Sequence, residues 1–148
     1  MGALVPFGSS KRPEKWKAAG LTASRLAPFL EFAMYQVKWI KSPSGKWHLL
    51  KTVDLSDVMA AGVFIIWRGG HSPAVIRVGQ GDIKTRLEAL RADRAIIAHS
   101  YDATLFVTWA VVPATHRSGI ERYLSNRYKP LVGGASPDVA PIAVNLAA

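Results

Sequence analysis

The sequence predicts an α+β domain in which an antiparallel sheet is flanked by helices, and three observations support this class. Apolar runs of strand length and helix-like segments follow one another from residue 62, in the order strand, strand, helix, strand, helix. The first two runs are separated by RGGHSP, a polar stretch with Gly and Pro that is typical of a hairpin loop. Strands joined by hairpins are antiparallel, so this order does not fit a doubly wound parallel sheet.

The first 61 residues are expected to form a basic extension that packs on a core domain of residues 62–148. A helix is predicted over residues 14–35, with Pro28 breaking or restarting it. YQVKWI and KWHLLKTV are expected to be strands, and the SPSG sequence between them suits a hairpin turn. The extension is therefore predicted to be a helix followed by a hairpin.

The core domain is predicted to contain three strands and two helices, followed by a Gly- and Pro-rich tail. GVFIIW and AVIRVG are the first two strands, and the alternating sequence DATLFVTWAVV is the third. A helix is expected over residues 82–95, because Asp82 can cap it and the apolar residues from Ile83 to Leu90 fall on one face. A second helix is expected over residues 118–128.

Charge is the feature of the composition that bears most on function. The chain carries 19 Lys and Arg against 10 Asp and Glu, and residues 1–51 account for +7 of the net +9 (nine basic minus two acidic residues). This excess favours nucleic acid, with DNA as the first choice, because Lys and Arg release counterions when they contact phosphates. The residues expected to contact it are Lys11, Arg12, Lys15, Lys17, Arg25 and Arg91. Alternatively, the N-terminal helix is amphipathic: its tryptophan packs on the domain, and its lysines face solvent without binding nucleic acid.

Other features of the composition argue against several classes of protein. The chain has no cysteine, and its four histidines lack ligand spacing, so neither a disulfide framework nor a structural zinc site is expected. No apolar run reaches the ~18 residues that a membrane span needs. The N-terminal apolar piece is too short for a secretory signal. A cytoplasmic protein with no membrane partner is therefore expected.

A set of short motifs resembles the GIY-YIG nuclease superfamily over residues 62–130. GVF at 62–64 matches the family's GIY triplet, and RVG at 77–79 matches its YIG triplet. Arg86 matches an arginine in the first turns of the next helix, and Glu121 matches a metal-binding glutamate. The resemblance implies a small three-stranded antiparallel sheet flanked by helices. It also implies endonuclease activity that uses one Mg²⁺ or Mn²⁺ ion.

The resemblance places Arg86, Glu121, Arg77 and Phe64 at catalytic positions, with Glu121 as the metal ligand. Arg86 would clamp the phosphate, since a guanidinium fork matches phosphate oxygens. A single carboxylate can hold Mg²⁺, because this ion keeps most of its waters. Arg77 and Phe64 stand where the family has tyrosines, and neither can deprotonate water at neutral pH. The family's asparagine position is taken by Gly133.

Each of these residues also has a purely structural interpretation. Ser118 and Glu121 have the spacing of a capping box, in which the glutamate satisfies amides of its own helix. Arg86 could be a solvated helix residue, and Arg77 could be an edge-strand charge that faces water. Asn145 is the nearby asparagine that could replace the one missing from the family pattern.

Three functions are compatible with this pattern. The first is a metal-dependent endonuclease that hydrolyses phosphodiester bonds. The second is a catalytically inactive nucleic-acid-binding module on the same fold, which the two missing tyrosines favour. The third is a protein-interaction module whose basic half meets only a partner chain.

Overall fold

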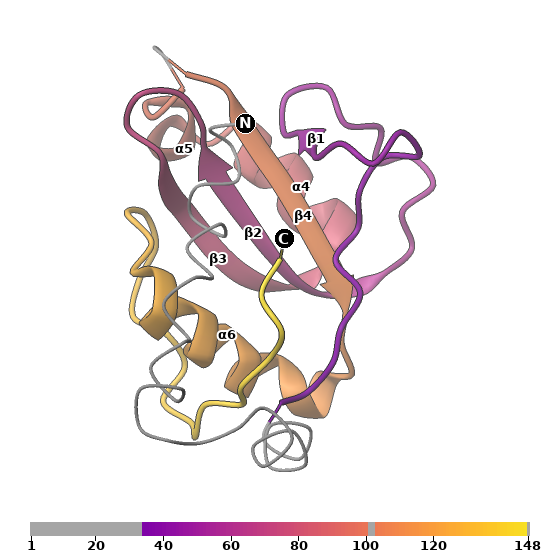
Figure 1. Cartoon of the computed structure of the whole chain (residues 1–148), viewed down its shortest axis with the longest axis vertical. Helices are drawn as coiled ribbons and strands as arrows, with labels where there is room; N and C mark the ends of the chain where they lie inside the picture. Colours follow the sequence, from indigo (N-terminus) through magenta and orange to yellow (C-terminus); the bar gives the residue numbers. More distant parts are fainter. Residues whose placement is uncertain (1–33, 101–102, 148) are drawn as a thin grey trace, which may run out of the picture.

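The computed structural model describes residues 34–100 and 103–147, and Figure 1 shows the course of the chain. Nearly all of the helix predicted over residues 14–35 lies outside the described residues. The same holds for five of the residues expected to bind nucleic acid, namely Lys11, Arg12, Lys15, Lys17 and Arg25. No described helix is long and apolar enough to cross a membrane.

The described residues form an α+β domain with an antiparallel sheet, as predicted. The strands are β1 (His48–Leu49), β2 (Ala61–Arg68), β3 (Ala74–Asp82) and β4 (Leu105–Val111). The helices are α4 (Ile83–Arg91), α5 (Arg94–Ile97) and α6 (Ala114–Tyr128). The strand order is β1-β4-β2-β3, and every neighbouring pair is antiparallel. In Figure 1, α6 lies in front of the sheet and α4 and α5 lie behind it.

The prediction of three strands was wrong, because the described part of the sheet has four. The fourth is β1, in which His48 pairs with Val107 on the free edge of β4. The turn at SPSG does form, with the Gly45 amide donating to the Ser42 carbonyl at 2.8 Å. Its flanks do not form the predicted ladder, however. Tyr35, from the first flank, instead makes a parallel bridge with Val144 near the end of the chain.

The sheet separates two apolar cores, and β2 contributes to both. Phe64 and Ile66 face the core under α4 and α5, whereas Val63, Ile65 and Trp67 face the core under α6. All five side chains are fully buried. A strand that is buried on both faces needs apolar residues at successive positions, which explains the continuous run GVFIIW.

The helix predicted over residues 82–95 is two helices. Asp82 caps α4 as expected, since its carboxylate accepts a hydrogen bond from the Thr85 amide at 3.0 Å. Hydrogen bonds from Thr85 lower the pKa of the Asp82 carboxyl. Asp93 then caps α5 by accepting from the Ala95 amide at 2.9 Å. A single continuous helix was wrong because Asp93 offers its own cap where the first helix ends.

Helix α6 begins one turn earlier than predicted, with Pro113 at its N-cap position. Ser118 and Glu121 therefore lie in the interior of the helix, where the backbone amides already have partners. The capping-box interpretation of Glu121 is therefore wrong. After α6, the chain returns along β3, and the Val132 amide donates to the Ile76 carbonyl at 2.8 Å.

Candidate functional site

The predicted metal ligand Glu121 meets the Gly-rich end of β3 through Gln80. Gln80 pairs with Val63, so its side chain points to the face of the sheet that α6 covers. Its Nε2 donates to Glu121 Oε1 at 2.8 Å and to Ser118 Oγ at 3.1 Å. Glu121 is half-buried, so this hydrogen bond fixes one carboxylate oxygen and orients the other.

Arg86 reaches the same residue from the other side. Its Nε donates to the Gln80 carbonyl oxygen at 3.2 Å. Its aliphatic stem passes Gly81, where an added Cβ would lie 3.4 Å from Arg86 Cγ. Gly81 has φ +125°, a conformation that favours glycine. Glycine here therefore serves both the backbone conformation and the path of the arginine.

We call Gln80, Arg86, Ser118 and Glu121 the Gln80 site. It brings a carboxylate and an exposed guanidinium to one residue at the end of β3. Gln80 was not predicted to be a site residue. The strand periodicity could have identified it. Arg77 and Gly79 point to one face of the strand, so Gln80, at the next position, points to the face that α6 covers.

Phe64, on β2, is a core residue on the face of the sheet opposite to the Gln80 side chain. It pairs with Gly79, and its ring lies across this glycine. A Cβ added to Gly79 would lie 2.8 Å from Phe64 Cε2, which is too close for two carbons. Phe64 is completely buried, so it contributes packing beneath the strand end.

Arg77 lies on the same face as Phe64, because it pairs with Ile66. It is half-buried, and its guanidinium runs along Gly133, where an added Cβ would lie 3.0 Å from Nη1. Its Nε is buried without a hydrogen-bond partner among the described residues. Gly133 and Arg77, two positions that the resemblance singled out, therefore lie beside each other.

Arg91 and Asn145 contact backbone groups far along the chain. Arg91 Nε donates to the Leu50 carbonyl at 2.9 Å, and its Nη2 donates to the Val53 carbonyl at 2.6 Å. Asn145 binds both backbone groups of Val37, accepting from its amide at 2.7 Å and donating to its carbonyl at 2.9 Å. The structure thus uses these two side chains to hold loops in place.

The Gln80 site offers a metal ion one carboxylate, that of Glu121. Among residues 34–100 and 103–147, no three His, Cys, Asp or Glu side chains gather as a metal-binding group. Magnesium needs only one or two protein carboxylates, because water fills its remaining positions. Glu121 Oε2 accepts no hydrogen bond from the described residues. Comparisons of the chain with protein-family models, with curated proteins and with solved structures gave no match.

Proposed function

We propose that the chain is a GIY-YIG-like nucleic-acid-binding domain that hydrolyses phosphodiester bonds with one Mg²⁺ or Mn²⁺ ion. The observation that supports this most is the meeting of Glu121 and Arg86 at Gln80. Phosphodiester cleavage needs charge stabilisation at the phosphate and a positioned water. The guanidinium of Arg86 would stabilise charge at the phosphate, and the carboxylate of Glu121 would hold the ion that positions the water.

Each side chain has a distinct role in this proposal. Arg86 binds non-bridging phosphate oxygens with the guanidinium nitrogens that its bond to Gln80 leaves free. Glu121 offers Oε2 to the metal while Gln80 holds Oε1. The bound ion would act as a Lewis acid on the phosphate. Arg77 adds positive charge beside the strand, and Phe64 supports the strand from below.

The proposed partner is DNA, and the proposed location is the cytoplasm. The basic N-terminal residues would give affinity for the phosphate backbone that does not depend on base sequence. Binding should therefore weaken steeply as salt concentration rises. The full chain is needed to test this, since residues 1–51 carry most of the net positive charge.

The test is a cleavage assay on duplex and single-stranded DNA with Mg²⁺ or Mn²⁺, comparing wild type with Glu121→Gln. The isosteric change removes the carboxylate, and we expect the rate to fall by at least about 100-fold. Glu88→Gln is the matched control, because Glu88 is an exposed glutamate on α4, and it should cleave like wild type. Equal cleavage by wild type and Glu121→Gln would contradict the catalytic role.

The second candidate is a nucleic-acid-binding module without catalysis. The burial of Phe64, which has no hydroxyl group, favours it. This candidate predicts salt-dependent DNA binding without cleavage, weakened by Arg86→Gln and unchanged by Glu121→Gln. Absence of any nucleic-acid affinity at low salt would instead indicate a protein-interaction module.

A further inference from the structure

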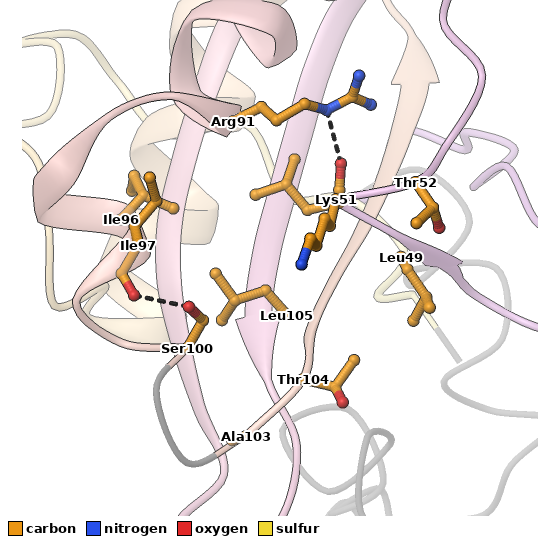
Figure 2. A pocket seen from close by; sticks show the side chains of 11 residues that line it. Leu49, Lys51, Thr52, Arg91, Ile96, Ile97, Ser100, Ala103, Thr104 and Leu105 are labelled. Carbon is orange, nitrogen blue, oxygen red and sulfur yellow. Dashed lines mark hydrogen bonds between the residues drawn. The ribbon is translucent and has the colours of Figure 1, made fainter.

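A pocket of about 450 Å³ opens on the face of the sheet that α4 and α5 cover (Figure 2). Its walls come from the turn after β1, the end of α4, α5 and the start of β4. None of the residues of the Gln80 site lines it. A volume of this size is ordinary for a small-molecule site.

About half of the residues that line the pocket are apolar. Its apolar lining residues are Leu49, Leu50, Ile96, Ile97, Ala103 and Leu105. Ile96 is fully buried, whereas Ile97 is 47% exposed and Leu49 is 39% exposed. Two large aliphatic side chains of the lining are thus partly exposed to water, and a bound apolar group would cover them.

The polar part of the lining is cationic or hydroxylic. It consists of Lys51, Thr52, Arg91, Ser100 and Thr104, and no described carboxylate lines the pocket. Figure 2 shows the Lys51 side chain directed into the pocket. Arg91 is held by two backbone carbonyls, so it fixes the wall, whereas Lys51 forms no ion pair with the described residues. The charge of the described lining is therefore complementary to an anion.

We propose that this pocket binds a small amphipathic anion, with an aliphatic body against the apolar lining and one carboxylate at Lys51. Burial of the aliphatic body provides the affinity, because apolar surface of both the ligand and the pocket is removed from water. The Lys51 ammonium group orients the carboxylate. The uncharged analogue of such a ligand lacks the second contact and should bind more weakly.

The test titrates the full chain with decanoate and with decanol, below the concentration at which either forms micelles, and follows methyl resonances by NMR. Decanoate should shift the methyl signals of Ile97 and Leu105 and leave those of Val63, on the opposite face, unchanged. Lys51→Gln should weaken decanoate binding about tenfold and leave decanol binding as it is. Lys46→Gln, an exposed lysine outside the pocket, should bind decanoate like wild type.

Three results would overturn the proposal. The first is the absence of any saturable shift at Ile97 and Leu105. The second is decanoate affinity in Lys51→Gln equal to that of wild type. The third is a set of shifts spread over both cores, which would mean that decanoate loosens the fold. Ile97→Glu is a second probe, since a negative charge in the lining should repel decanoate while the exposed position tolerates the change.

Discussion

Gly79→Ala is expected to destabilise the fold, because the ring of Phe64 occupies the space that a side chain would need. A Cβ at this position would lie 2.8 Å from Cε2 and 3.1 Å from Cε1 of Phe64. Carbon atoms in contact normally stay about 3.5–4.0 Å apart. The ring would therefore have to move by roughly 1 Å or more in a site where Phe64 is completely buried, because its Cζ lies closer still to the added Cβ.

The expected loss is about 1–2 kcal/mol in the free energy of unfolding. Overpacking a well-filled core costs about 1–3 kcal/mol. Replacing glycine returns up to about 1 kcal/mol, because the unfolded chain of Gly79→Ala is less flexible. Phe64→Leu removes the atoms that clash, so the double variant should be about 1–2 kcal/mol more stable than the sum of the single effects predicts.

Urea denaturation followed by circular dichroism measures these free energies in wild type, both single variants and the double variant. Gly134→Ala is the matched control, because an added Cβ there meets nothing within 4 Å. This control should be neutral or slightly stabilising. If Gly79→Ala costs no more than Gly134→Ala, or costs the same with leucine at position 64, the proposed clash is refuted.

Three further predictions concern contacts outside the Gln80 site. Arg91→Met should lower the free energy of unfolding by about 2–4 kcal/mol, because two backbone carbonyls lose a charged donor. Urea denaturation of wild type and variant measures this loss. Asn145→Ala should cost about 2 kcal/mol by freeing two half-buried backbone groups, whereas the exposed Asn126→Ala should cost little in the same assay. Burial lowers the pKa of His48, which stacks on Trp109, below 6.5. The imidazole of His48 therefore binds a proton more tightly in the unfolded chain than in the folded one. The melting temperature of wild type should fall as the pH drops below 6.5, and the fall should be smaller in His48→Gln.

The central hairpin and its following helix could be predicted because their signals are local. The apolar runs of β2 and β3 are bounded by a Gly- and Pro-containing loop, and Asp82 caps its helix through a residue three positions away. Strand β1 lies within the predicted strand KWHLLKTV but is only two residues long, and its pairing with β4 was not predicted. Its pairing depends on the free edge of β4, which exists only once the sheet has formed.

Of the four residues predicted at catalytic positions, Glu121 and Arg86 meet at Gln80, whereas Phe64 and Arg77 lie on the other face of the sheet. Glu121 and Arg86 were chosen by their place in a motif order, and their shared partner Gln80 was missed. The contact between Gln80 and Glu121 spans 41 positions, and it requires the correct face of β3 and the correct start of α6. A one-turn error in the helix start also produced the capping-box interpretation. Side-chain partners across such separations follow from tertiary packing, which local patterns do not encode.

The parallel bridge between Tyr35 and Val144 has a mechanical consequence. The segment that enters the described domain and the segment that leaves it run side by side in the same direction. Asn145 and the backbone hold them together through several bonds at once. Tension applied through the chain on the two sides of this clamp would pull the segments past each other and load all of these bonds in shear. They would have to break together rather than one by one, so the domain should resist unfolding by a threading protease that pulls from either side.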